Sequence, residues 1–173
     1  EEGRVGYLED IGLEEESGMS PVLVGHDRTS EAFWAMVAEA KGVTDSSLKC
    51  AKERIDEAGY LGTRIVLKSD QEEAIKALKR AITVKRQADT VMIESPVRES
   101  KANGSVERAV RTWAAQVRTL RHHLESRIKV KVPRTSALMT WFVAWSADNI
   151  NRYKIRSSGR TSYEHITGHR GLQ

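Results

Sequence analysis

The segment LKSDQE, residues 67–72, places an acid at the junction of a strand and a helix. The apolar run at residues 64–67 predicts a buried strand, and residues 71–83 carry apolar side chains at helical spacing. Asp70 therefore stands at the carboxyl end of a strand, where open α/β sheets bind their ligands. Taken alone, an Asp before a helix is more often an N-cap. Both interpretations of Asp70 remain open at this point.

Four other apolar runs bounded by Gly, Pro, Ser or Asp predict strands at residues 4–13, 22–25, 31–37 and 90–93. Residues 45–58 predict a helix stopped by Gly59. Consecutive strands with short connections favour antiparallel pairing, and strands reached across helices favour parallel additions to the same sheet. We therefore expect an α/β fold with a five-stranded mixed sheet flanked by helices.

The chain after Pro96 is predicted to be helical. Residues 100–127 carry one apolar stripe over six or seven turns, which is either core or a partner interface: Val106, Val110, Trp113, Val117, Leu120 and Leu124. A further helix follows Pro133 and contains Leu138, Trp141, Phe142 and Trp145, and residues 161–167 predict a last short helix stopped by Gly168.

Charge is distributed unevenly along the chain. Residues 1–96 hold 13 Lys and Arg against 19 Asp and Glu, a net of −6, whereas residues 97–173 hold 15 against 5, a net of +10. A basic surface concentrated on a few elements is typical of proteins that bind phosphate backbones. The alternative is a well-solvated helical surface.

Composition limits the classes of protein that the chain can represent. Its 173 residues fit one domain, and the sequence contains no apolar run long enough for a bilayer and no signal peptide, so we expect an intracellular protein. Cys50 is the only cysteine, which excludes an internal disulfide and a cysteine-rich zinc site. Because the chain opens on Glu1 rather than Met, we expect a fragment of a longer polyprotein.

Asp70 and Glu107 together form a more specific pattern than Asp70 alone. It lies one turn inside the long helix, in ANGSVER, residues 102–108, after the proline-containing loop ESPVRES, residues 94–100; 36 residues separate the two acids. In loop, spacing and helix context this pattern resembles the catalytic core of retroviral and long-terminal-repeat retrotransposon integrases, polynucleotidyl transferases of RNase H-like fold. The resemblance covers nearly the whole chain and extends to TSYE, residues 161–164, and Gly168.

The resemblance implies a reaction and its cofactor. Asp70, Glu107 and an Asp in the first strand would hold two Mg²⁺ or Mn²⁺ ions, which stabilise the attacking and leaving oxygens of phosphoryl transfer. Water would trim the 3′ end of element DNA, and the new 3′-hydroxyl would attack target DNA. The first strand offers Glu9 and Asp10, whose side chains point to opposite faces of a sheet, and we favour Asp10.

The helix that carries Glu107 also offers candidate DNA contacts. Arg111, Arg118 and Arg121 lie near the Glu107 face, and we add Arg108 and, in the loop, Asn103. The alternative is that these arginines only solvate an amphipathic helix. His122 and His123 are adjacent, and Gly168 separates His165 from His169, so neither pair has convincing zinc-ligand spacing.

The whole chain, residues 1–173, is thus predicted to be an integrase catalytic core. Strands and aspartate sites occupy 4–94, the active-site loop and glutamate helix 95–128, and C-terminal helices 133–168. The resemblance implies element-end DNA, target DNA and a second copy of the chain as partners, and action in the nucleus after an intracellular particle stage. Two alternatives remain open: a catalytically decayed or domesticated domain that retains DNA binding and self-association, and an RNase H-type nuclease.

Overall fold

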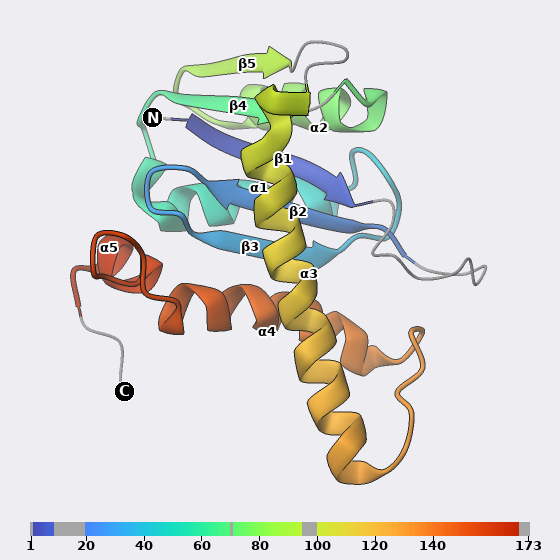
Figure 1. Cartoon of the computed structure of the whole chain (residues 1–173). Coiled ribbons are helices and arrows are strands. Elements are labelled where there is room, and N and C mark those ends of the chain that lie inside the picture. The colour runs from blue at the N-terminus through green and yellow to red at the C-terminus, as the bar shows by residue number, and fades with distance from the viewer. Residues whose placement is uncertain (1, 9–19, 70, 95–99, 170–173) are drawn as a thin grey trace.

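The computed structural model describes residues 2–8, 20–69, 71–94 and 100–169, with the main chain alone at 2–8 and 100–106 (Figure 1). Five strands form one sheet in the order β3-β2-β1-β4-β5. Their bounds are β1 Glu2–Leu8, β2 Val22–Asp27, β3 Phe33–Val37, β4 Ile65–Ser69 and β5 Thr90–Glu94.

Pairing within the sheet is mixed, as predicted. β1 pairs with β2, and β2 with β3, in antiparallel register. β4 joins β1, and β5 joins β4, in parallel register. The expected five-stranded mixed sheet is therefore confirmed. The predicted first strand reached residue 13, but β1 ends at Leu8 and residues 9–13 lie outside the described part of the chain.

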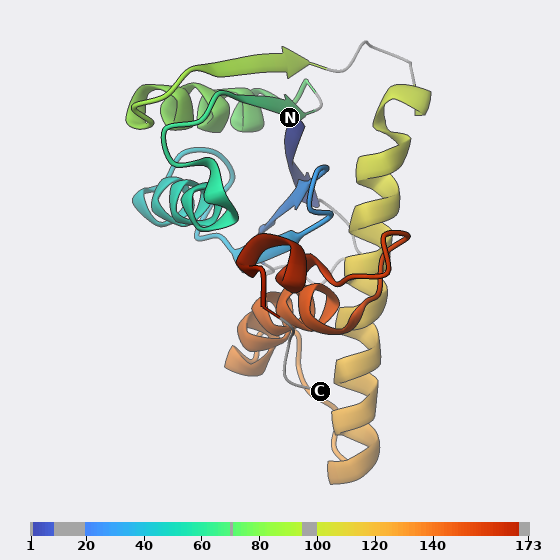
Figure 2. The same ribbon diagram turned by 90° about the vertical axis from the view of Figure 1, so that its left-hand side faces the viewer.

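The predicted helices are also present, with small shifts at their ends. They are α1 Asp45–Ile55, the π-helical turn η1 Asp56–Tyr60, α2 Glu73–Lys85, α3 Ser100–Ile128, α4 Ala137–Tyr153 and α5 Ser162–Thr167. Figure 2 shows three layers, with α1 and α2 on one face of the sheet and α3 on the other. Among the described residues, no helix has the length and apolar character needed to cross a membrane.

The middle of the apolar stripe of α3 is core. Trp113 is fully buried, and its indole Nε1 donates to the main-chain oxygen of Val143 in α4 at 3.0 Å. Val117 is buried in the same cluster, which joins α3 and α4 to one face of β2 and β3. A partner interface through Trp113 and Val117 is thus excluded, because both side chains are used within the chain. Leu120 is partly buried against this cluster.

A second apolar cluster fills the opposite face of the sheet. The alternation of side chains along a strand sends Leu23 to this face while its neighbours Val22 and Val24 join the first cluster. The second cluster combines Leu23 with residues of α1, α2 and β4: Ala51, Ile55, Ile65, Leu67, Ile75, Leu78 and Ile82. The predicted apolar face of the helix after Asp70 is therefore confirmed.

The edge strand β3 is capped by a side chain from α4. The Asn151 amide donates to the main-chain oxygen of Phe33 at 2.7 Å, and its Oδ1 accepts from the Phe33 main-chain N–H at 2.8 Å. These two bonds imitate a neighbouring strand. They fix the crossing of α4 at the edge of the sheet.

Glu125 holds together the elbow between α3 and α4. Its carboxylate accepts from the Arg121 guanidinium at 2.9 Å, the Lys131 ammonium at 3.0 Å and the Val132 main-chain N–H at 2.9 Å. The main-chain bond from Val132, followed by the bond from Lys131, lowers the pKa of Glu125 to about 2. The charged form of Glu125 therefore stabilises the folded elbow.

We predict that Glu125→Gln lowers the Tm at pH 7 by a few degrees. Because the pKa of Glu125 is lower in the folded chain than in the unfolded one, its contribution is fully present above the unfolded pKa. It is lost as pH falls through the folded value of about 2, so the Tm difference between variant and wild type shrinks below about pH 4.5. Thermal melts at pH 7, 5 and 3 measure this. Glu53→Gln, at an exposed position on α1, is the control; equal Tm losses at all three pH values would contradict the prediction.

Candidate active site

The carboxyl ends of β4 and β5 form the edge at which the sequence predicts catalysis. β4 ends at the buried Ser69 and β5 at Glu94, and the two residues are opposite each other in the parallel ladder. Both strands run toward the first turns of α3 (Figure 2). Asp70 follows Ser69 directly and lies outside the described residues. The N-cap of α2 is Glu72. The alternative prediction, that Asp70 is the N-cap of this helix, is therefore wrong.

Glu107 is the one predicted carboxylate whose side chain the structure describes. It lies near the end of the second turn of α3, and its side chain is exposed. The Arg111 Nε lies 3.4 Å from the main-chain oxygen of Glu107, so this arginine folds back along the helix. An exposed carboxylate is free of the core and open to a cation from solvent.

The other predicted ligands are not placed. Asp10 and its alternative Glu9 lie outside the described residues, and Asn103 is described in its main chain only. Within the described part of the chain, no three His, Cys, Asp or Glu side chains gather as a metal cluster. The predicted donor set consists of three carboxylates, whose hard oxygens suit Mg²⁺ or Mn²⁺. The chemistry of the set therefore fits the predicted ion.

The four predicted DNA-binding arginines of α3 divide into two groups. Arg108, Arg111 and Arg118 are exposed, whereas the Arg121 side chain is 23% exposed and paired with Glu125. At about 100° per residue, Arg111 and Arg118 lie within roughly 40° of Glu107 around the helix. One exposed face of α3 therefore carries the glutamate and two cations, and Arg121 serves the elbow.

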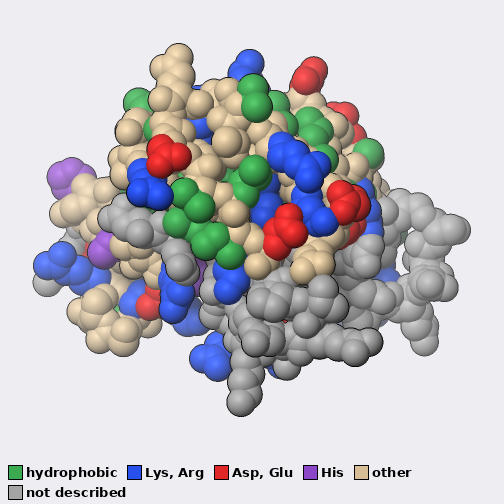
Figure 3. Space-filling view, turned by 90° about the horizontal axis from the view of Figure 1, so that it is seen from above, with side chains coloured by type: hydrophobic (Ala, Val, Ile, Leu, Met, Phe, Trp, Pro, Cys, Tyr) green, Lys and Arg blue, Asp and Glu red, His purple; other side chains and the backbone are tan. Residues whose placement is uncertain are grey.

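The end of the molecule formed by β5 and α2 has mixed surface chemistry. Seen from above, in Figure 3, acidic, basic and hydrophobic side chains alternate over the described part of this end. The exposed apolar side chains of α2 and β5 are Val84, Met92 and Ile93. The described residues at this end thus form no broad patch of a single charge.

A cleft that the sequence did not predict lies away from this edge, between α1 and the C-terminal helices. It has a volume of about 260 Å³, and its residues come from β2, β3, α1, η1, β4, α4 and α5. Trp34 lies against Gly25, where an added Cβ would come within 2.0 Å of the indole. The absence of a side chain at Gly25 therefore leaves the space that the Trp34 indole occupies beside the cleft.

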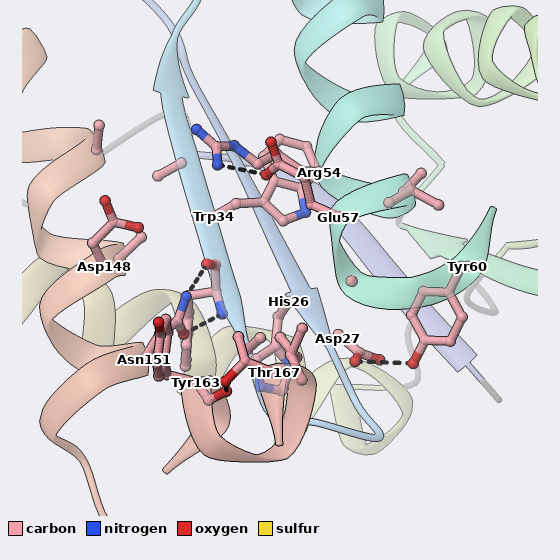
Figure 4. Close-up of a pocket in the computed structure, with 18 of the residues that line it drawn as sticks. His26, Asp27, Trp34, Arg54, Glu57, Tyr60, Asp148, Asn151, Tyr163 and Thr167 are labelled. Carbon is pink, nitrogen blue, oxygen red and sulfur yellow. Dashed lines mark hydrogen bonds and ion pairs between the residues drawn. The ribbon is translucent and has the colours of Figure 1, made fainter. Parts of the chain in front are cut away.

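Two pairs of polar side chains are joined along the cleft (Figure 4). Arg54 pairs with Glu57 at 2.7 Å, and the Tyr60 hydroxyl donates to Asp27 at 3.0 Å. The Asp27 carboxylate also accepts from the Ser30 main-chain N–H at 3.0 Å and from the Ser30 hydroxyl. Asp27 thus serves the turn that follows β2, and the fold brings Tyr60 to it from 33 residues away in the sequence.

Comparison with known proteins places the fold. No family model and no curated protein matches the chain. Among solved structures, the catalytic core of BIV integrase matches with a TM-score of 0.58 and 12% identity, over 96% of this chain and 93% of that one. The HTLV-2 integrase catalytic core, a trimeric form in complex with magnesium, matches with a TM-score of 0.59 and 11% identity, over 95% of each chain.

A simian T-cell lymphotropic virus intasome also matches, with a TM-score of 0.64 and 13% identity. That match covers 99% of this chain and 56% of the intasome chain. Identities this low establish the arrangement of strands and helices and leave the chemistry to the residues themselves. The chain has the fold of retroviral integrase catalytic cores.

Proposed function

We propose that this chain is a metal-dependent DNA strand-transferase that carries out 3′-end processing of element DNA and its transfer into target DNA. The observation that carries this proposal is the placement of Glu107. It is exposed on α3, whose first turns lie at the end of the sheet toward which β4 and β5 run. Asp70 is the next residue after β4, so the sequence supplies a second carboxylate at the same edge.

Asp70, Glu107 and Asp10, with Glu9 as the alternative to Asp10, would hold two Mg²⁺ or Mn²⁺ ions. Such ions stabilise the attacking and leaving oxygens of an in-line phosphoryl transfer. Magnesium is present in the HTLV-2 integrase structure of the same fold, which supports this choice. Glu107 lies on α3, and Asp70 directly follows β4 in the sequence; the core holds both of these elements in place.

The exposed face of α3 supplies the proposed DNA contacts. Arg108, Arg111 and Arg118 are exposed on the helix that carries Glu107, so phosphates bound to them would lie along the approach to the same edge. The net charge of +10 over residues 97–173 supports a polyanionic partner on the helical side of the molecule. Asn103 stays a proposed contact near the reacting DNA end.

The chain is proposed to self-associate through α4. The apolar stripe of α3 is not available for this, because Trp113 and Val117 are buried within the chain. Trp141 is 52% exposed and Leu138 44% exposed, and the Trp141 and Trp145 rings stack with centroids 5.4 Å apart. On the next turns of the same helix, Asp148 and Arg152 line the cleft. An aromatic surface beside a recess suits a two-fold interface, in which each copy offers both features to the other. The intasome and the trimeric HTLV-2 core support assembly for this fold.

We predict that Glu107→Gln reduces strand transfer at least about a hundredfold, because it removes a charge that the proposed metal site needs. Since the side chain is exposed, stability should change by less than about 0.5 kcal/mol. The measurement is joining of a preprocessed DNA end to target DNA with Mg²⁺ or Mn²⁺, alongside a thermal melt.

Glu53→Gln, an exposed glutamate on α1, is the matched control and should join DNA normally. Full joining by Glu107→Gln would remove that residue from the site. Cleavage of an RNA–DNA hybrid without any joining would favour the nuclease alternative. A folded wild-type chain that binds DNA but neither cuts nor joins it would favour the decayed domain.

We predict that the double variant Arg111→Ala with Arg118→Ala binds DNA more weakly and with a smaller salt dependence. Each lost phosphate contact lowers the magnitude of the slope of log K against log salt by about 0.9, so the magnitude should fall by up to roughly 1.8 in the double variant. Fluorescence anisotropy over a range of salt concentrations measures the slope. The double variant Lys49→Ala with Lys154→Ala, which removes two exposed cations outside α3, should keep it. Equal slopes for the two double variants would contradict the prediction and would mean that Arg111 and Arg118 only solvate the helix surface.

We predict that Trp141→Glu prevents self-association, because a charge inserted into an aromatic interface stays desolvated and unpaired. The wild-type interface should bury on the order of 2,000 Å² or more. Sedimentation velocity at tens of micromolar distinguishes the species. Val84→Glu, at an 86% exposed apolar position on α2, should leave the assembly intact. A wild-type monomer under these conditions, or an unchanged Trp141→Glu oligomer, would rule out this surface.

A further inference from the structure

The two edges of the sheet end differently. At β3, the Asn151 amide occupies the main-chain groups of Phe33 and closes that edge. β5 is the other edge strand of the five-stranded sheet, and Figures 1 and 2 show it as the outermost strand. The chain therefore provides a cap for one edge, and the groups at the other edge need their own account.

The strand register decides which main-chain groups of β5 face outward. In a parallel ladder, alternate residues of a strand turn their N–H and C=O groups to the same neighbouring strand. The Ile65 N–H in β4 donates to the main-chain oxygen of Asp89 at 3.1 Å, so Val91 and Ile93 also turn their main-chain groups to β4. The residues of β5 whose main-chain groups face away from β4 are Thr90, Met92 and Glu94.

Met92 lies at the centre of this open edge. No group of the described residues hydrogen-bonds to its main-chain N–H or oxygen. The Met92 side chain is 43% exposed and that of Ile93 38% exposed, and as neighbours in a strand they point to opposite faces of the sheet. Natural edge strands are often blunted by Lys, Pro or a bulge, and β5, with the sequence TVMIE, contains none of these.

Surface area and charge indicate what kind of partner suits this edge. A contact confined to five residues is far from the roughly 20–30 residues a side of a stable interface between globular proteins, which disfavours a second copy of the chain. A flexible segment needs only the length of the strand. Glu94, at the end of β5, is exposed and has no ion pair within the described part of the chain, so it favours a basic residue in the partner.

We propose that the open edge of β5 binds an extended peptide segment by strand addition. The main chain of the segment pairs with the outward groups on either side of Met92, which supply affinity without regard to sequence. Apolar side chains at its centre cover Met92 and Ile93, and a basic residue at one end meets Glu94. This site consists of described residues only and does not depend on the proposed metal site.

The experiment is amide hydrogen exchange, followed by NMR, on the whole chain with the acetylated and amidated peptide KTVVVTK. A Lys at each end reaches Glu94 in either strand direction. In the free chain, the Met92 amide should exchange faster than those of Val91 and Ile93, which bond to β4. With the peptide at about ten times its Kd, exchange at Met92 should slow about tenfold. The Phe33 amide, bonded to Asn151, is the internal control and should not change.

Two variants of Met92 test the main-chain contact through the Kd of the labelled peptide, measured by fluorescence anisotropy. Met92→Pro removes the outward N–H and spares the ladder with β4, because proline is tolerated where the N–H of an edge strand faces solvent. It should weaken binding about tenfold, since one peptide carbonyl loses its donor. Met92→Thr keeps the N–H and should bind nearly as the wild type does.

A change of charge tests the proposed contact with Glu94. The peptide ETVVVTE should bind the wild type more weakly than KTVVVTK does, because it brings a second carboxylate to this end of the edge. Glu94→Lys should reverse that order. The same order of affinities in wild type and variant would overturn the preference for a basic partner.

The remaining outcomes decide the site itself. Absence of KTVVVTK binding, or binding that leaves exchange at Met92 unchanged, overturns strand addition at β5. Protection of the Met92 amide that rises with the concentration of the chain alone would assign the edge to a second copy and overturn the peptide as its occupant. If Met92→Pro does not fold, the exchange measurement on the wild type still decides. None of these results bears on strand transfer, so the proposed function is tested separately.

Discussion

The contact between Trp113 and α4 determines the placement of most of the helical half. The ring is fully buried, and its N–H donates to the Val143 carbonyl. This contact fixes both the rotation of α3 about its axis and its position along α4. Removing a buried ring of this size costs about 3–5 kcal/mol, a large share of the stability of a domain. Because α3 is one continuous helix, the same contact also orients Glu107, six residues or roughly 9 Å along the axis.

The chain separates its charges by element. The acidic first half forms the sheet with α1 and α2, and the basic second half forms the three helices that pack around one face and edge. Glu125 is an exception in the second half, and its position explains why: it neutralises Arg121 and Lys131, which the elbow brings together. Among the exposed cations of α3, Arg108 and Arg111 lie within about one turn of Glu107, which adds positive potential beside the proposed site.

Local sequence patterns predicted the elements well, because each has a clear period and clear ends. The strand before Asp70 and the helix after it follow from apolar spacing, and the mixed pairing follows from the lengths of the connections. Contacts between distant segments could not be predicted in the same way. The bond between Tyr60 and Asp27, the cleft beside them and the burial of Lys79 depend on register and packing. The Trp113 stripe illustrates this limit, since its spacing is the same for a core and for an interface.

Asn151 makes completion of the β3 edge depend on α4, which follows β3 far later in the sequence. Its amide occupies the main-chain groups of Phe33 across 118 residues of sequence. During synthesis, β3 is made long before α4 exists, so the nascent edge is open to pairing with another chain. A growing or truncated chain that lacks α4 is therefore exposed to edge-to-edge aggregation. In the folded chain, α4 therefore protects the edge of β3 from such pairing.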